Sequence, residues 1–357
     1  MSNTDLALDA TVADQLLQRA TIDSGAQLRG WKLEHMDVHP GVQATATYLV
    51  ELTRGSRPVR TRFGITRRAG GPTRSDSLAD VYQDGRNTVA IWEYPEDPDL
   101  PALAIAANGR ELARALIQYG VLPKRADPTQ LQVELTSYRP RRRAVFRAWW
   151  DEDLWYVKVL RPESLTATRD RHRMLLDAGI PAPEVLVAAR SGLLVMPQLP
   201  GRPLADAIFD PKPPISAESL IELLDSLPAE VSSLPRRPPW ASGVEHFANQ
   251  IARTMPALEN KLNWLTDDIL SGLANSPVGN EPTHGDFHEG QIRIARRRVT
   301  GLLDIETLGP GSRVDDLACL VAHLACVQNM NDAQHERIAE LLRQWVPVFD
   351  ERVEQVR

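Results

Sequence analysis

Acidic and amide side chains gather in one short stretch of the chain, THGDFHEGQIRIARRRVTGLLDIETLGPGSRVDDLA. Asp286 follows His284 closely, Gln291 comes five positions after Asp286, and Asp304 and Glu306 follow further along. Carboxylates that lie close together repel each other unless a cation lies between them. Carboxylate and amide oxygens are ligands that Mg²⁺ accepts. The stretch therefore predicts a magnesium ion that carries the phosphates of ATP.

The spacing in this stretch matches a known arrangement for phosphoryl transfer. In protein kinases, an Asp in the catalytic loop is followed five positions later by an amide, and a metal-binding Asp comes downstream. That chemistry needs an acid at the acceptor hydroxyl and metal ions that bridge the phosphates. The segment VTGLLDIE reads as a strand, which would present Asp304 and Glu306 on one face because side chains alternate. Before it, QIRIARRRV reads as the first arm of a β-hairpin with a basic turn.

A lysine upstream could serve the same phosphates. Lys158 stands between Val157 and Val159 in LWYVKVLRP, a strand that is otherwise apolar. From there its ammonium group could reach the α- and β-phosphates of a nucleotide, although a surface lysine on an edge strand would give the same pattern. The acidic stretch downstream favours the phosphate role, because each motif predicts the place of the other.

The elements before Lys158 are predominantly β. Thr11 and Asp14 form a capping box, which predicts a helix over VADQLLQRA. RGWKLEHMDV, ATATYLVEL, RTRFGIT and TVAIWEYP are strand candidates, and NGRELARALIQYG is a helix that ends at a glycine. LQVELTSY, RAVFRAWW and LWYVKVL then predict three more strands, with a hairpin turn at Asp151–Asp153. The sequence thus predicts a small α+β unit up to about residue 125 and a second β-rich block after it.

The remainder of the chain is predominantly helical. Ser216 is expected to cap a helix over SAESLIELLDSL. Apolar residues recur every three or four positions from Val244 to Ile269, which predicts a long helical face. Pro256 should kink or divide that helix. The acidic stretch therefore lies inside the helical part.

Length and composition restrict the class of protein. The chain has 357 residues, with 43% hydrophobic and 25% charged residues, which is typical of a globular protein of two or three domains. Its net charge of −6 argues against a nucleic-acid partner. The start, MSNTDLALDA, lacks the features of a signal peptide, and no apolar run is long enough to cross a bilayer. We therefore expect a cytoplasmic monomer or homodimer with no membrane partner.

Several motifs together resemble a known family. HGDFHEGQ, LLDIE, YVKVL, LLDAGIPAPEVL, LLVMPQLPGRPL and VDDLACLVAHL look like the aminoglycoside phosphotransferase group of the protein-kinase-like superfamily. Gln291 and Glu306 stand where other members of the group carry Asn and Asp. In this respect the motifs most resemble those of maltokinase and bacterial glucosamine kinase. The resemblance implies an α+β, protein-kinase-like fold of two lobes. It places an N-terminal α+β cap domain at residues 1–125, a β-rich N-lobe at 126–197 and a helical C-lobe at 198–357.

The resemblance also implies roles for individual residues. Asp286 would be the catalytic base or orienting acid. Gln291 and Asp304 would hold Mg²⁺, and Glu306 would help the metals or the substrate. Lys158 would bind the phosphates of ATP. The other expected members are the hinge residues Met196, Gln198 and Leu199, which would bind adenine through backbone groups, and Asp315 or Asp316, which would brace the catalytic loop.

The chain departs from the family pattern before and after Lys158. SYRPRRRAVFRAWW stands where a glycine-rich loop is expected, and Arg139 and Arg141 to Arg143 would either contact phosphate or form a solvated hairpin. Glu163 and Asp170 are the acids available to pair with Lys158.

The function expected from these features is an ATP- and Mg²⁺-dependent kinase that acts on a hydroxyl of a sugar or aminosugar. Three alternatives remain: a phosphotransferase for aminoglycosides or other antibiotics, a nucleotide-binding pseudokinase, and an enzyme that transfers AMP.

Overall fold

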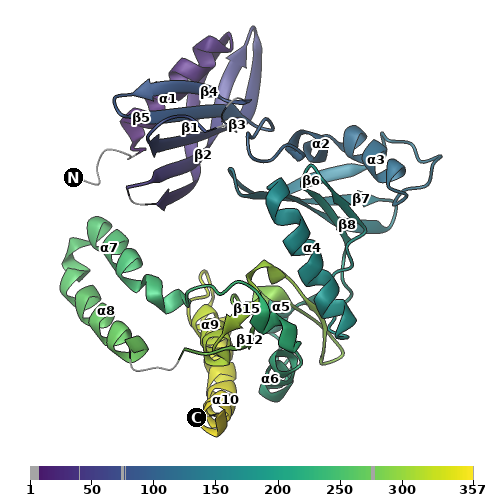
Figure 1. Cartoon of the computed structure of the whole chain (residues 1–357), viewed down its shortest axis with the longest axis vertical. Coiled ribbons are helices and arrows are strands. Elements are labelled where there is room, and N and C mark those ends of the chain that lie inside the picture. Colours follow the sequence, from purple (N-terminus) through teal and green to yellow (C-terminus); the bar gives the residue numbers. More distant parts are fainter. Residues whose placement is uncertain (1–7, 40, 74–75, 77, 275–277, 357) are drawn as a thin grey trace. The chain divides into compact units, whose positions relative to one another are not determined.

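The computed structural model describes residues 8–356 apart from 40, 74–75, 77 and 275–277. The chain divides into two compact units. The first unit comprises Met1–Thr166 and Val185–Gln198, and the second comprises Ala167–Glu184 and Leu199–Arg357. The first contains two five-stranded sheets, and the second is mainly helical (Figure 1). The predicted α+β fold, β-rich first and helical afterwards, is confirmed.

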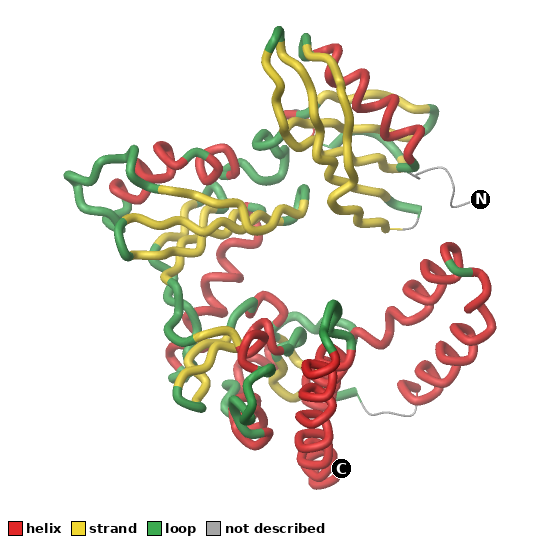
Figure 2. The backbone as a smooth tube through the Cα atoms, turned by 180° about the vertical axis from the view of Figure 1, so that it is seen from behind, coloured by secondary structure: helices red, strands yellow, loops and turns green. Residues whose placement is uncertain are grey.

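The first sheet is antiparallel and has the strand order β1-β2-β3-β5-β4. Helix α1 covers one face of it and buries Ala13, Leu17 and Ala20 in the same core as the strands (Figure 2). The predicted capping box is wrong, because Asp9 is the N-cap and accepts a hydrogen bond from the backbone N–H of Val12 at 2.9 Å. The elements are α1 (Ala10–Asp23), β1 (Ala26–His39), β2 (Gln43–Arg54), β3 (Arg57–Ala69), β4 (Asp80–Asp84) and β5 (Asn87–Glu93).

The second sheet is also antiparallel, in the order β6-β7-β8-β10-β9. Helices α2 and α3 bury Leu103, Leu112 and Leu116 in one core with Phe146 and Val157 of this sheet. The domain boundary near residue 125 stays a prediction, and the core of the second sheet includes side chains from both sides of it. The elements are α2 (Leu103–Ala107), α3 (Gly109–Gln118), β6 (Gln132–Arg139), β7 (Arg143–Trp150), β8 (Asp153–Leu160), β9 (Val187–Ala189) and β10 (Leu193–Pro197).

The core of the second unit is formed by helices packed around a small hairpin. Leu220 of α6, Leu320 of α9 and Leu341 of α10 are fully buried together with Ile292 and Leu302 of β13 and β14. The elements are α4 (Pro162–Asp177, which begins in the first unit), β11 (Arg202–Pro203), α5 (Leu204–Ala207), α6 (Ala217–Asp225), α7 (Val244–Thr254), α8 (Glu259–Ala274), β12 (Glu281–Thr283), β13 (Ile292–Ala295), β14 (Arg298–Leu302), β15 (Gly309–Gly311), α9 (Arg313–Ala325) and α10 (Asp332–Val356).

Two predicted helix boundaries in this unit are confirmed. Ser216 caps α6 and accepts a hydrogen bond from the backbone N–H of Ser219 at 3.2 Å. Pro256 separates α7 from α8, where it begins a short 3-10 turn. None of the helices in the described ranges combines the length and the apolar character that crossing a membrane requires.

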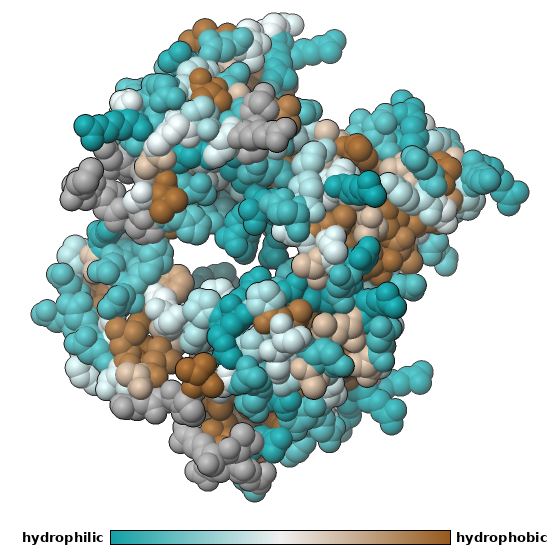
Figure 3. All heavy atoms as spheres, viewed as in Figure 1, coloured by the Kyte–Doolittle hydropathy of each residue, from teal (hydrophilic) through white to brown (hydrophobic). Residues whose placement is uncertain are grey.

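The α7–α8 hairpin carries apolar side chains on its surface. Its pattern of apolar residues was predicted as one helical face, and much of that face is exposed. Figure 3 shows apolar side chains gathered over this hairpin, at the left of the view. The exposed members of the predicted face are Phe247, Ile251, Met255 and Ile269, and Trp264 of α8 is exposed as well.

Candidate active site

The loop that contains Asp286 is anchored by a buried carboxylate from another element. Asp316, on the first turn of α9, is only 1% exposed. Its two oxygens accept hydrogen bonds from the backbone N–H groups of His284 and Gly285, both at 2.7 Å. Burial raises the pKa of Asp316, although His284 and the two N–H groups oppose that shift. Of the two bracing acids expected from the sequence, Asp316 is the one that makes these contacts.

The residues around Asp286 give the loop its shape. Gly285 has a φ of +79°, a region that favours glycine, and a Cβ atom there would lie 2.7 Å from the carbonyl oxygen of Thr307. His284 is buried and its Nε2 lies 2.9 Å from the carbonyl oxygen of Leu303. Phe287 is fully buried in the core of the second unit. Asp286 itself is half-buried, so the loop presents its carboxylate while the neighbouring residues hold the backbone.

Gln291 and Asp304 lie next to each other. The backbone N–H of Leu303 donates to the carbonyl oxygen of Gln291 at 2.8 Å, which holds the two segments together. Asp304 follows with φ 50° and ψ 47°, a left-handed conformation that aspartate tolerates better than most residues. Its Oδ2 lies 3.5 Å from the side-chain amide of Gln291. These two predicted metal ligands are therefore brought together.

The sequence predicted this proximity for the wrong structural reason. Asp304 and Glu306 were expected on one face of a strand, but β14 ends at Leu302 and a 3-10 turn runs over Ile305–Thr307. The left-handed turn at Asp304, rather than strand alternation, aims its carboxylate. Glu306 lies within the 3-10 turn, and its backbone oxygen accepts a hydrogen bond from Arg237 at 3.1 Å.

His288 determines how the amide of Gln291 is turned. The backbone N–H of Gly290 points at Nδ1 of His288 at 3.1 Å, and a backbone N–H can only donate. Nδ1 therefore accepts, and the proton of the neutral ring is on Nε2. Burial, together with His323, lowers the pKa of His288 below its usual 6.5, against the opposing charges of Glu289 and Asp286, so the ring is neutral near pH 7.

The oxygen of the Gln291 amide is the atom that can accept from this ring. One end of the amide lies 2.9 Å from Nε2 of His288 and 3.5 Å from Oδ2 of Asp304. The nitrogen occupies that end in the structure, and a half-turn of the amide places the oxygen there. With Nε2 of His288 as donor, the oxygen suits that contact, whereas the carboxylate of Asp304 by itself favours the nitrogen. A cation between Gln291 and Asp304 reverses the second preference, because two oxygens can then face it.

That pair of oxygens fits a magnesium ion. Mg²⁺ takes oxygen ligands at 2.0–2.1 Å in an octahedron, whose neighbouring oxygens lie about 3 Å apart. The 3.5 Å between the Gln291 and Asp304 atoms needs only a small closure. A cation also removes the repulsion that the two oxygens would otherwise have. The donor set is therefore compatible with the ion that the sequence predicts.

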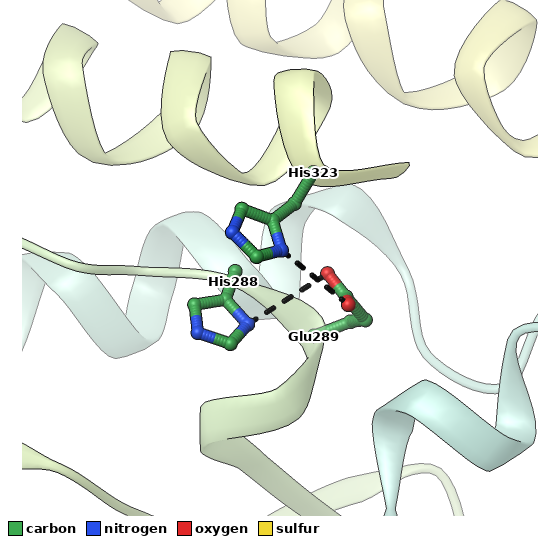
Figure 4. A group of neighbouring side chains, drawn as sticks. All are labelled: His288, Glu289 and His323. Carbon is green, nitrogen blue, oxygen red and sulfur yellow. Dashed lines mark ion pairs between the residues drawn. The ribbon is translucent and has the colours of Figure 1, made fainter. Parts of the chain in front are cut away.

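A second cluster, His288, Glu289 and His323, lies beside the loop (Figure 4). The two imidazole rings stack with centroids 4.0 Å apart and planes at 14°. Nδ1 of His288 lies 3.9 Å from one oxygen of Glu289, and Nδ1 of His323 lies 3.7 Å from the other. Imidazole binds metals in the plane of its ring, so two stacked rings cannot both direct a lone pair at one ion between them. The cluster is therefore an acid flanked by two imidazoles and is a poor metal centre.

Glu289 retains an unused acceptor near Asp286. The side chain is buried, and its Oε2 accepts no hydrogen bond from the described residues. Burial raises the pKa of the Cys319 thiol to about 12, with further contributions from the charges of Asp286, Asp316 and Glu289. Cys319 therefore lies close to all three acids, and the surroundings of Asp286 are strongly acidic.

Lys158 and most of the hinge belong to the first unit. β8 lies between β7 and β10, so Lys158 is on an interior strand and not on an edge, and it is 7% exposed. Met196 is buried beside Leu194. The backbone N–H of Gln198 donates to the carbonyl oxygen of Leu154 at 2.9 Å, so this N–H is engaged within the sheet, and the adenine contact stays a prediction. Leu199, in the second unit, packs over Gly301.

The acids proposed as partners of Lys158 have other ion pairs. Glu163 lies 3.5 Å from Arg161, and Asp170 lies 2.8 Å from Arg169. Both acids are exposed on α4.

The β6–β7 turn, which replaces a glycine-rich loop, is held by acids from earlier in the chain. Arg141 is 7% exposed and pairs with Asp76 at 2.5 Å and Asp99 at 3.1 Å, and its guanidinium lies over the ring of Trp92. Its backbone N–H donates to Asp97 at 2.8 Å. Neither reading of this turn holds for Arg141, because a buried and paired guanidinium is neither solvated nor available to phosphate.

Other residues of the same turn add to this clasp. Tyr138 donates its hydroxyl to Asp97 at 2.7 Å and accepts a hydrogen bond from the indole N–H of Trp92 at 2.9 Å. Arg142 pairs with Asp37 at 2.9 Å, but this pair is more exposed. We call these contacts of Tyr138, Arg141 and Arg142 the turn clasp. The sequence analysis did not detect it.

Trp240 and Arg237 are further residues that the sequence analysis missed. The indole N–H of Trp240 donates to the carbonyl oxygen of Gly285 at 2.9 Å, directly before Asp286. The proline-rich segment LPRRPPW was expected to be a surface loop, so its contacts with the catalytic loop had no local signal. A shallow cavity of about 520 Å³ lies elsewhere, lined by residues such as Arg202, Lys212 and Arg296, and contains none of the predicted site residues.

The chain is similar to several solved phosphotransferases. Macrolide 2′-phosphotransferase MphH from Brachybacterium faecium is 20% identical, with a TM-score of 0.43, over 68% of this chain and 83% of that chain. An aminoglycoside-3′-phosphotransferase of type VIII is 22% identical, with a TM-score of 0.42, over 67% and 93%. Aminoglycoside phosphotransferase APH(4)-Ia, in complex with ADP and hygromycin B, is 14% identical, with a TM-score of 0.47, over 67% and 83%. A comparison with curated proteins finds no match.

A β-rich unit with an interior lysine is followed by a helical unit with a His-Gly-Asp loop, an arrangement that fits a phosphotransferase. The model of the phosphotransferase enzyme family matches residues 140–352, more than half of the chain. The chain belongs to this family, as its motifs predicted. The closer resemblance to maltokinase and glucosamine kinase stays a prediction.

Proposed function

We propose that the chain is an ATP- and Mg²⁺-dependent kinase that phosphorylates a hydroxyl group of a sugar or aminosugar. The observation that carries this proposal is the approach of the Gln291 amide to Asp304 at 3.5 Å, in a segment that also contains Asp286. Gln291 and Glu306 stand where other members of the group carry Asn and Asp, and this form of the motif supports a sugar as acceptor.

Each residue has a distinct part in the proposed reaction. Asp286 orients the acceptor hydroxyl and takes its proton. Gln291 and Asp304 hold the metal, Glu306 assists them, and Lys158 binds the phosphates of ATP. When bound, magnesium would neutralise the charge that develops on the transferred phosphoryl group. Met196, Gln198 and Leu199 are the proposed adenine contacts.

A cationic acceptor is favoured by the acids near Asp286. Glu289 is buried, and its Oε2 accepts no hydrogen bond from the described part of the chain. That oxygen is shielded from solvent, so the negative charge of this side chain would act on an ammonium group of the acceptor through space and not through a hydrogen bond. The charge of these acids supports an aminosugar over a neutral sugar, and it makes an aminoglycoside the second candidate acceptor.

The test is incubation with Mg²⁺, ATP and a panel of sugars, aminosugars and aminoglycosides, with ADP and AMP both measured. Acceptor-dependent ADP release that is abolished in Asp286→Asn is the expected result. Formation of AMP-modified product would instead indicate nucleotidyl transfer. ATP binding without product formation from any acceptor would indicate a pseudokinase and would overturn the proposal.

A further inference from the structure

Trp240 is a large aromatic side chain that lies at the catalytic loop and remains exposed. Its indole N–H donates to the carbonyl oxygen of Gly285 at 2.9 Å, and Gly285 immediately precedes Asp286. The residue is nevertheless 59% exposed. Tryptophan usually buries most of its surface, so an exposed indole beside a proposed catalytic acid needs an explanation.

The backbone that carries Trp240 is fixed by contacts with the catalytic segments. Arg236 donates to the carbonyl oxygen of Gly279 at 2.6 Å, and Arg237 donates to that of Glu306 at 3.1 Å. Together with the indole bond to Gly285, these contacts tie this short segment to chain that precedes Gln291 and to chain that follows Asp304. Trp240 is therefore held in one place, and its exposure is not a consequence of a loose loop.

The chemistry of an exposed indole suits a sugar ring. The hydrogen bond to Gly285 uses the N–H edge of Trp240, so the ring faces are the surface that a ligand can cover. One face of a pyranose ring is formed by C–H groups, while its hydroxyls lie at the rim, and binding sites combine such apolar walls with a few polar groups. An ammonium group on the ligand would gain a further attraction to the indole face.

We propose that Trp240 is the stacking platform for the acceptor, on which the sugar or aminosugar ring packs with a hydroxyl directed at Asp286. This inference rests on the proposed function, because it names the site at which that acceptor binds. It adds a specificity-determining residue: an acceptor without a flat apolar face loses the contact with Trp240 and binds weakly.

The alternative is a purely structural role, in which Trp240 only stabilises the loop through its hydrogen bond to Gly285. Two substitutions separate these roles. Trp240→Phe removes the N–H donor and keeps an aromatic face, whereas Trp240→Leu removes both and keeps an apolar side chain. Trp264→Leu is the matched control, because Trp264 is on α8 in the same unit and is 65% exposed.

The experiment measures binding separately from turnover. Glucose, glucosamine and kanamycin are the probes, titrated by calorimetry into Asp286→Asn protein. This variant keeps the acceptor site but should not transfer the phosphoryl group. We expect saturable binding of at least one probe, which Trp240→Leu weakens by about tenfold or more. Trp240→Phe should stay within about threefold of the parent protein, and Trp264→Leu should be unchanged.

Kinetics with the active protein give a second readout. Trp240→Leu should raise the KM of the acceptor with little change in kcat or in the KM of ATP, whereas a loop brace would lower kcat and leave acceptor affinity intact. Equal affinity in Trp240→Leu, or no saturable binding of any probe, overturns this inference. Trp240-dependent binding without phosphorylation would refute the proposed function and leave the stacking site standing.

Discussion

Asp316 accepts the backbone N–H of His284 at 2.7 Å across 32 residues of chain. Its second oxygen takes the N–H of Gly285, so one carboxylate holds two consecutive peptide groups directly before Asp286. The position of the proposed catalytic acid is thus determined by a buried side chain from α9.

Asp316→Asn should destabilise the protein and slow the reaction. An amide has one acceptor oxygen in place of two, so one buried N–H loses its partner at a cost of about 1–3 kcal/mol. Thermal unfolding and kcat would be measured together. Asp315→Asn is the control: Asp315 is exposed, and we expect a change within about 0.5 kcal/mol. Equal effects of the two substitutions would contradict the bracing role.

Gly285→Ala should displace the catalytic loop. The positive φ of +79° costs a non-glycine residue about 1–2 kcal/mol, and the new Cβ would meet the oxygen of Thr307 at 2.7 Å. Gly179→Ala is a matched control, because Gly179 has a φ of +77° and open space around its Cβ position. Both variants should lose stability, but only Gly285→Ala should lose kcat as well. Loss of activity in both would mean that backbone strain alone is responsible.

His288→Ala should raise the Mg²⁺ concentration needed for half-maximal ADP formation by about tenfold or more, because residues that orient metal ligands contribute about that much to affinity. The imidazole lies 2.9 Å from the amide of Gln291 and is expected to orient it. His323→Ala removes the stacked ring without removing that contact, and its Mg²⁺ dependence should stay close to that of the parent protein. An unchanged Mg²⁺ requirement in His288→Ala would argue against this role.

Arg141→Met should destabilise the first unit. The substitution removes one of the two guanidinium groups that pair with buried Asp76 and leaves the other, that of Arg68. Breaking a buried pair completely costs about 3–5 kcal/mol, and the remaining partner should keep the loss at or below the lower end of that range. Arg142→Met, one residue further along the same turn, removes a more exposed pair with Asp37 and should cost less than about 1 kcal/mol. Denaturant unfolding measures both. Similar losses would show that the turn clasp does not depend on Arg141.

The effect of Arg141→Met should depend on pH. Burial raises the pKa of Asp76, but hydrogen bonds from Thr73 and Arg141 outweigh it, so the net pKa lies below the usual 3.8. A carboxyl with a depressed pKa stabilises the folded state above its unfolded pKa and loses that contribution as the pH falls through the folded pKa. The stability difference between the parent and Arg141→Met should therefore be largest above pH 3.8 and shrink below it. A difference that grows on acidification would contradict the pairing.

The sequence predicted best where the signal is local. The strands around Lys158, the cap at Ser216 and the division at Pro256 all follow from neighbouring residues, and the structure confirms them. The loop motif brought Asp286 and Gln291 into one segment in the same way. The start of α1 was misplaced by one such local pattern, because Asp9 competes with Thr11 as a cap and makes the bond.

Contacts between distant segments could not be predicted. Arg141 and Asp76 are 65 positions apart, so no spacing rule links them, and the basic turn looked exposed for that reason. Trp240 and Gly285 are 45 positions apart and give no common pattern either. The left-handed turn at Asp304 was missed because aspartate also tolerates the strand conformation that its apolar neighbours suggested.

The turn clasp has a consequence for proteolysis. A segment such as RPRRR offers trypsin several consecutive cleavage points, yet the backbone N–H and the side chain of Arg141 are both engaged in buried contacts. Cleavage therefore requires that those contacts open first, so that the chain can enter the active site of the protease. The rate of digestion at this turn therefore reports how often the N-terminal acids release it, and it does so without any nucleotide or acceptor.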